Sequence, residues 1–213
     1  MAALERLSRV LRAPGRAAPR RPRAATARAL ACVGLLAALL VPAAGGTVGQ
    51  EASRVSAEYD LKAAFLFNFT QFVEWPPEAF PEASTPITIG ILGDDPFGRS
   101  LDEMVADEVV RNRKLLIRRF RDVAQVDACH VLFVSPSETR SLDRVLAALD
   151  RRSILTVGEN PDFVAHSGIV AFVLSHNRLR LRINLAAARA ARLTISSKLL
   201  RQAQIVGGET PGP

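Results

Sequence analysis

Short apolar runs alternate with helix-like segments through the middle of this chain. The runs are rich in Val, Ile, Leu and Phe and end in turn-forming or polar residues, which predicts buried strands at residues 87–92, 115–120, 130–134 and 154–157. Helices are predicted at residues 97–110, 138–150 and 161–165. Strands that alternate with helices in this way indicate a single α/β domain with a mostly parallel sheet flanked by helices.

The pattern changes in the C-terminal third of the chain. Residues 168–174 and 178–183 are both rich in β-forming residues, and only Ser175-His176-Asn177 separates them. This spacing predicts an antiparallel hairpin at one edge of the sheet. Two further helices are predicted at residues 185–192 and 197–204, the second capped by Ser196 or Ser197.

The second arm of the predicted hairpin alternates strictly between apolar and basic residues. Its apolar positions point to one face of the sheet, and the other face carries Arg178, Arg180 and Arg182. That face is therefore predicted to be solvent-exposed and strongly cationic. The arginines either protect a solvated edge strand by their charge or bind an anionic ligand, because guanidinium groups suit phosphate and carboxylate.

A first helix is predicted over residues 57–74, which lack Gly and Pro and are followed by Trp75-Pro76-Pro77. Its apolar residues cover more than one side, a wider stripe than one-sided burial needs. Either the helix packs between the sheet and another element, or some aromatic residues face a partner or a second copy. The predicted partner-binding residues are Phe65, Phe69, Phe72 and Trp75.

The net charge of +7 is concentrated at the N-terminus. Eight arginines and one glutamate lie in the first 44 residues, and an apolar stretch at residues 29–41 and small residues follow. This order predicts a secretory signal peptide over residues 1–44, cleaved near Ala44. The alternative is an uncleaved anchor, but thirteen apolar residues fall short of the roughly 20 that span a bilayer.

The remaining chain is balanced in charge, and its domain organisation is simple. Residues 45–56 are predicted to be a flexible lead-in, residues 57–206 the folded domain and residues 207–213 a disordered tail. Export places the domain outside the cytoplasm, and cleavage leaves no stable membrane insertion. A nucleic-acid partner is not expected, because the excess positive charge belongs to the leader.

No catalytic constellation, metal site or cofactor site is predicted. The three histidines do not share metal-binding spacing, and the chain has no Gly-x-Ser-x-Gly motif. The segment from Gly93 to Ser100 has the frame of a phosphate-binding loop, but Arg99 replaces the lysine and Pro96 removes a backbone donor. A capped turn between strand and helix is the better interpretation.

One thiol is expected in the processed chain, since cleavage removes Cys32 and leaves Cys129. No intramolecular disulfide can then form. Cys129 precedes a buried strand, so it is either a structural buried cysteine or a reactive thiol beside His130, although alternation sends these two neighbours to opposite faces.

Any small-molecule site should lie where open α/β sheets place their ligands, beyond the carboxyl ends of the parallel strands. The candidate ligand-binding residues in these loops and on the arginine-rich strand are Asp94, Asp95, Glu159, Asn160, Arg178, Arg180 and Arg182. Two adjacent carboxylates supply too few ligands for a metal ion.

Four segments of the chain form a specific combination. They are Lys62-Ala-Ala-Phe-Leu-Phe-Asn-Phe69 with Phe72-Val-Glu-Trp-Pro76, then residues 92–98, 129–135 and 182–200. With this combination the chain resembles the YfiR-like (YfiR/HmsC type) periplasmic regulatory proteins over about residues 57–206.

The resemblance implies a periplasmic, non-enzymatic α/β domain that commonly forms a homodimer. It further implies repression of an inner-membrane diguanylate cyclase by binding the periplasmic sensor domain of that cyclase, so that release raises cyclic di-GMP in the cell. The best-understood members use paired cysteines for redox control, whereas only Cys129 survives processing here, so that control is not carried over. The alternative function is a periplasmic small-molecule sensor or binding protein.

Overall fold

The computed structural model of the protein describes residues 48–207. The predicted signal peptide and nearly all of the predicted C-terminal tail lie outside these residues. The chain divides into two compact units, residues 1–54 and 55–213. Of the first unit only residues 48–54 are described, and they form the start of helix α2, Val48–Phe72. The second unit is the α/β domain.

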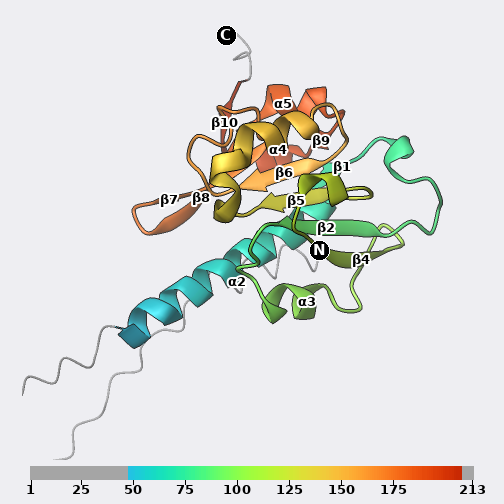
Figure 1. The fold of residues 1–213 in the computed structure, drawn as a ribbon. Coiled ribbons are helices and arrows are strands. Elements are labelled where there is room, and N and C mark those ends of the chain that lie inside the picture. The colour runs from blue at the N-terminus through green and yellow to red at the C-terminus, as the bar shows by residue number, and fades with distance from the viewer. Residues whose placement is uncertain (1–47, 208–213) are drawn as a thin grey trace, which may run out of the picture. The chain divides into compact units, whose positions relative to one another are not determined.

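An eight-stranded mixed sheet forms the centre of the domain, with strand order β10-β8-β7-β6-β5-β2-β4-β3 (Figure 1). The four predicted parallel strands are present and pair in parallel as β4-β2-β5-β6. Their bounds are β2 Ile87–Leu92, β4 Arg113–Phe120, β5 Val131–Val134 and β6 Leu155–Gly158. The other strands are β3 Val109–Val110, β7 Val170–Ser175, β8 Arg178–Asn184 and β10 Ala203–Val206.

Three of the parallel strands, β2, β5 and β6, are buried on both faces, which explains why their sequences are continuous apolar runs. The prediction that residues 115–120 form a buried strand was wrong, because β4 lies next to the edge strand β3 and only its Leu115 and Phe120 are buried. Every residue of β2, β5 and β6 is buried. Gly90 in the middle of β2 lets neighbouring side chains approach the β2 backbone closely. A Cβ at this position would lie 2.8 Å from Cys129 Sγ and 2.9 Å from a methyl carbon of Leu132. A side chain at this position would therefore disturb the packing of three strands.

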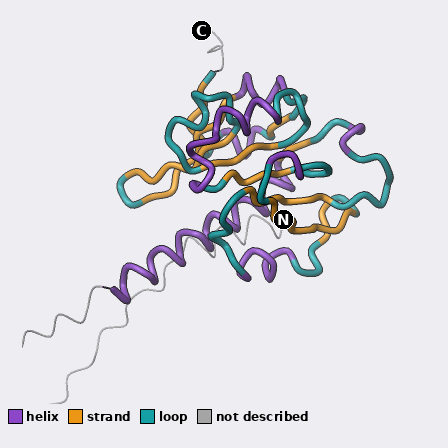
Figure 2. The backbone as a smooth tube through the Cα atoms, viewed as in Figure 1, coloured by secondary structure: helices purple, strands orange, loops and turns teal. Residues whose placement is uncertain are grey.

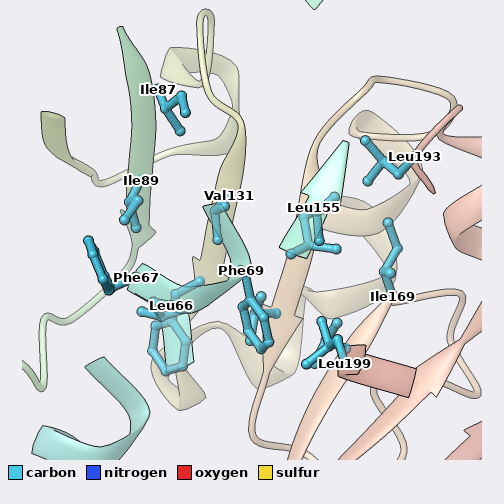
Figure 3. Packing of buried hydrophobic residues seen from close by; sticks show 14 of the residues in the cluster. Leu66, Phe67, Phe69, Ile87, Ile89, Val131, Leu155, Ile169, Leu193 and Leu199 are labelled. Carbon is cyan, nitrogen blue, oxygen red and sulfur yellow. The ribbon is translucent and has the colours of Figure 1, made fainter. Parts of the chain in front are cut away.

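Helices cover the two faces of the sheet unequally. One apolar cluster joins the strands to α2, α3 (Arg99–Val105), α5 (Leu185–Ala190) and α6 (Ser197–Leu200). The cluster on the opposite face contains α4 (Leu142–Ala148) and the loop with Phe163 and Val164. Figure 3 shows residues of the first cluster, with Leu66 and Phe69 of α2 near Val131 of β5.

A small second sheet connects the C-terminal end of α2 to the C-terminal part of the chain. Strand β1, Val73–Glu74, pairs antiparallel with β9, Thr194–Ile195. The Ser196 N–H also donates to the carbonyl of Phe72 at 2.9 Å. The Ser196 side chain accepts from the Leu199 N–H and caps α6, as the sequence predicts.

The predicted hairpin is formed by β7 and β8, which pair antiparallel. Its two-residue loop, His176-Asn177, has φ values of 50° and 58°, the left-handed conformation that such tight hairpin turns require. The hairpin forms one side of the sheet and runs past the ends of its neighbours (Figure 2). One further strand, β10, pairs in parallel with β8 on its outer side.

Several predicted helices are shorter in the structure. The segment 97–110 is helical only over α3 and ends in β3, and the segment 138–150 begins with a 3-10 helix, Pro136–Ser141, before α4. Residues 161–165 form turns instead of a helix. The helix predicted over 197–204 was wrong beyond Leu200, because β10 follows and supplies hydrogen-bond partners to β8.

The first helix begins earlier than predicted. It starts at Val48 instead of residue 57, so most of the segment predicted as a flexible lead-in is helical. It ends at Phe72 near the predicted stop, where Val73 and Glu74 pair as β1 before Trp75-Pro76-Pro77. Two short 3-10 helices, Pro77–Ala79 and Val123–Gln125, complete the elements of the described chain.

Candidate functional site

The four aromatic residues proposed for partner binding do not share one environment. Phe69 is fully buried and Trp75 is 8% exposed, and both belong to the core. Phe65 and Phe72 are half-buried and pack against that core from outside. Of the two interpretations of the wide apolar stripe, packing of the helix between elements therefore accounts for Phe69 and Trp75, and a surface role is open only to Phe65 and Phe72.

Trp75 and His130 form a buried polar contact in the core. The Trp75 indole N–H donates to the carbonyl of His130 at 3.1 Å, and the His130 ring stacks on Phe80 at 4.5 Å. His130 Nδ1 accepts from the Thr88 N–H at 3.1 Å, so Nε2 carries the proton and donates to the Ala79 carbonyl at 3.1 Å. Burial lowers the pKa of His130, and nearby Arg113 adds to this effect. The ring is therefore a neutral structural group.

Cys129 and His130 directly precede β5, and their side chains lie in different surroundings, Cys129 in the cluster with α4 and His130 against Trp75 and Phe80. Cys129 is 6% exposed and packs in that cluster. Burial raises the pKa of its thiol to about 12, which leaves almost no thiolate near neutral pH. Its surroundings match a structural cysteine and give no support to a reactive thiol.

The two aspartates after β2 differ in their roles. Asp95 accepts hydrogen bonds from the backbone N–H groups of Phe97 and Gly98, at 2.8 and 3.2 Å, and its second oxygen accepts from Arg119 at 2.7 Å. This is the capped turn that the sequence predicts. The Asp94 side chain is exposed, while its backbone N–H donates to Ser137 Oγ at 3.0 Å.

Arg119 links this turn to α3. Besides Asp95 it bonds both carboxylate oxygens of Asp102, at 2.6 and 3.1 Å. The hydrogen bonds that Arg119 donates to Asp102 and Asp95 outweigh partial burial and raise the pKa of Arg119. Both oxygens of Asp95 are thus already engaged within the protein, which leaves Asp94 as the freer carboxylate of the pair.

The arginine row lies on β8, and the structure does not bring it together with the aspartates. Arg178 and Arg180 are exposed and Arg182 is half-buried. Three strands, β7, β6 and β5, separate β8 from β2 in the sheet. The interpretation of β8 as a solvated edge strand was wrong, because β10 pairs outside it and is itself the edge.

A buried ion-pair network at the carboxyl end of β6 was not predicted as a unit. Lys62 on α2 has a side chain only 3% exposed, and its Nζ lies 2.8 Å from Glu159 and 2.6 Å from Glu58. The Lys62 ammonium also lies 4.3 Å from the centre of the Tyr59 ring. Burial alone would lower the pKa of Lys62, but hydrogen bonds to Glu159 and Glu58 outweigh it and raise that pKa. The sequence signal was a single lysine within the apolar stretch of a helix.

Glu159 also borders a cavity of about 270 Å³ beyond β5 and β6. One of its oxygens bonds Lys62, and the other is buried with no hydrogen-bond partner within the described chain. Ser135, Glu138 and Asn160 line the same cavity. Two of the predicted candidates, Glu159 and Asn160, are therefore brought together here, away from the arginine row.

The described part of the chain offers structural rather than reactive groupings. Within residues 48–207, no three His, Cys, Asp or Glu side chains converge in a way that could hold a metal ion. In the same residues, no helix has the length and apolar character that crossing a bilayer requires. The fold defines an α/β domain whose polar side chains mainly brace helices and turns.

Residues 59–204 match the YfiR/HmsC-like family, and the chain belongs to that family. The family comprises periplasmic regulators of cyclic di-GMP signalling and is regulatory rather than enzymatic. The predicted resemblance is therefore confirmed at the level of the family. No curated protein matches the chain.

Two solved structures are distantly similar. A conserved domain protein from Vibrio cholerae O1 biovar El Tor shares 15% identity with a TM-score of 0.41, over 55% of this chain and 54% of that one. An ABC domain in complex with L-Trp from Streptococcus pneumoniae shares 12% identity with a TM-score of 0.43, over 61% of this chain and 58% of that one. The chain thus spans little more than half the length of each.

We expect Lys62 to be required for stability. Replacing it with Met leaves the largely buried Glu159 carboxylate unpaired, and the free energy of unfolding should fall by roughly 3 to 5 kcal/mol. Urea denaturation measures this change. Glu58→Gln is the matched control, because the Glu58 side chain is 32% exposed and its pairing with Lys62 should contribute at most about 1 kcal/mol. Equal effects of the two variants would contradict a role for the buried pair.

We also expect His130 to make stability depend on pH. Its pKa in the folded protein lies below the ordinary value of 6.5, so the unfolded chain binds more protons between the two values. This contribution is complete above about pH 6.5 and is lost as the pH falls towards the folded pKa.

Thermal unfolding between pH 7.5 and pH 5 measures the effect of His130. The variant His130→Asn, whose amide oxygen can still accept from Thr88, should show a shallower fall in the unfolding midpoint than the wild type. His176→Asn in the exposed hairpin turn is the control and should keep the wild-type slope. A wild-type slope in His130→Asn would show that another group is responsible.

Proposed function

We propose that this protein restrains an inner-membrane diguanylate cyclase by binding the periplasmic domain of that enzyme, and that it acts as a homodimer. The observation that carries the proposal is family membership across residues 59–204. In this proposal the bound cyclase is inactive, and its release raises cyclic di-GMP inside the cell. A leader at residues 1–44 would direct the protein to the periplasm.

The partner-binding surface we propose combines Phe65 on α2 with the projecting hairpin. Leu174 near the hairpin tip is 56% exposed, the largest exposure among the exposed large apolar residues of the described chain. Its cross-strand neighbour is Leu179, which is half-buried. The Phe65 ring lies 5.9 Å from the ring of Phe172, two residues before Leu174 on the same face of β7.

This surface has the character expected of a binding site for a protein. Exposed apolar side chains next to a half-buried aromatic ring lose contact with water when a partner covers them, which favours association. The surface keeps Phe65 from the predicted set and omits Phe69 and Trp75, whose side chains are in the core. Phe72 is the last residue of α2, about two turns beyond Phe65 and next to β1, and is left outside the proposed contact.

Deletion of the gene should raise cellular cyclic di-GMP, because the cyclase loses its inhibitor. The full-length chain should restore the parental level, whereas a form lacking residues 2–44 should not, because it stays in the cytoplasm. Quantifying cyclic di-GMP in the four strains tests this. An unchanged level on deletion would contradict the proposed function, and restoration by the leaderless form would contradict the periplasmic site of action.

Leu174→Ser should weaken binding of the cyclase periplasmic domain roughly tenfold, since one well-placed apolar contact is worth more than about 1 kcal/mol at an interface. Affinity is measured with the purified domain after its recovery from envelope extracts. Val109→Ser in β3 is the control: Val109 is 55% exposed but lies at the opposite edge of the sheet. Both variants should keep the unfolding midpoint. An unchanged affinity in Leu174→Ser would remove the hairpin from the interface.

A further inference from the structure

A cationic groove lies along the hairpin side of the sheet. It has a volume of about 710 Å³ and is formed by β7, β8, β10 and the short connection between α6 and β10. The polar residues that line it are Ser175, Arg180, Arg182, Arg201, Gln202 and Gln204. Its volume falls within the range of about 300 to 1,000 Å³ that small-molecule sites occupy.

Strand register explains why these side chains meet. Arg180 and Arg182 are two residues apart on β8 and so point to the same face of the sheet. Gln204 of β10 pairs with Arg182 in the parallel ladder and projects beside it. Arg201 is the C-cap residue of α6 and lies in the short connection that leads from α6 to β10. On this face α4 packs with residues of β5 and β7, and Arg180, Arg182 and Gln204 lie outside that cluster.

The positive charge of the groove is not balanced by the protein. No acidic residue is among the residues that line it. The side chains of Arg180 and Arg201 are exposed, and neither side chain forms an ion pair or a hydrogen bond within residues 48–207. Arg119 and Arg113 behave differently: Arg119 bonds two aspartates, and Arg113 bonds three backbone carbonyls.

Arg182 provides an independent indication of a ligand. Its Nη1 donates to the carbonyl of Pro161 at 3.1 Å, which holds the guanidinium in place. Its Nε is buried and has no hydrogen-bond partner in the described part of the chain. The Arg182 guanidinium therefore has unused donor capacity, and its Nη2, which has no hydrogen bond within the described chain and is not buried, is the donor that a ligand oxygen in the groove would meet. Protection of an edge strand does not explain these arginines, because β10 covers the edge of β8.

We propose that this groove binds a small organic dianion, either a phosphate monoester or a dicarboxylate. The forked guanidinium groups of Arg180, Arg182 and Arg201 match the oxygens of both anions. The amides of Gln202 and Gln204 can bond the polar part of the ligand body, and Val173 and Ala203 offer it apolar contact. The inference concerns a face other than α2 and does not rest on the proposed cyclase partner.

Isothermal titration of the full chain at pH 7.5 and constant ionic strength tests the proposal, with phenyl phosphate and phthalate as probes and neutral benzyl alcohol as the uncharged control. Binding of at least one dianion and none of benzyl alcohol is expected. Binding of phenyl phosphate alone assigns the ligand to phosphate monoesters, and binding of phthalate alone assigns it to dicarboxylates. Failure of both dianions to bind would overturn the proposal.

The double variant Arg180→Gln/Arg201→Gln should weaken dianion binding by about tenfold or more, because two charge-assisted contacts are lost. Both residues are exposed, so the fold should survive, and circular dichroism verifies this. The matched control is Lys114→Gln/Arg121→Gln, which removes the same charge from exposed residues in and after β4, on the other side of the sheet. The control should bind within about twofold of wild type. Equal loss in both double variants would show nonspecific charge attraction and overturn the site.

Discussion

The packing of α2 on the parallel strands is the contact on which the rest of the domain depends. Leu66 and Phe69 are fully buried there, and the helix belongs to the same apolar cluster as β2, β5, β6, β7 and β8. Two polar connections fix the position of the helix: the Lys62–Glu159 ion pair in its middle, and the β1–β9 pairing that follows its last residue, Phe72. Displacing α2 would expose apolar area on five strands and leave buried charges unpaired.

The polar residues of the domain fall into two groups with different physical purposes. Asp95, Arg119, His130, Lys62 and Glu159 have most of their hydrogen-bonding atoms engaged within the protein. They stabilise turns and helix positions. Hydrogen bonds to carboxylates raise the pKa of Lys62 and of Arg119, and burial lowers the pKa of His130. Arg180 and Arg201 are instead exposed and unpaired within the described residues, and Leu174 is an exposed apolar residue on the neighbouring strand. Exposed and unpaired side chains of this second group are the ones available to bind a ligand or a partner protein.

These two surfaces place the proposed activities on one structural feature, the β7–β8 hairpin. Phe172 and Leu174 point to the face of the sheet that carries α2, whereas Val173 and the arginine row point to the opposite face. A ligand in the cationic groove and a protein on the apolar surface would therefore contact alternate residues of the same strands. The β10 strand, which pairs with β8, forms one wall of this arrangement.

Local sequence determined much of this protein: the four parallel strands, the hairpin with its tight turn, the Ser196 cap and the capped turn at Asp95. Each depends on residues close together in the chain, whose apolar period or turn chemistry is readable directly. Only the tertiary structure decided that residues 203–206 pair with β8, that Phe69 and Trp75 are buried, and that Lys62 meets a glutamate 97 positions away. The same holds for the groove, where Arg201 joins Arg180 and Arg182 from a different element. The physical reason is that burial, strand pairing and charge neutralisation depend on contacts between elements distant in sequence. Such contacts produce no periodic pattern in the local sequence.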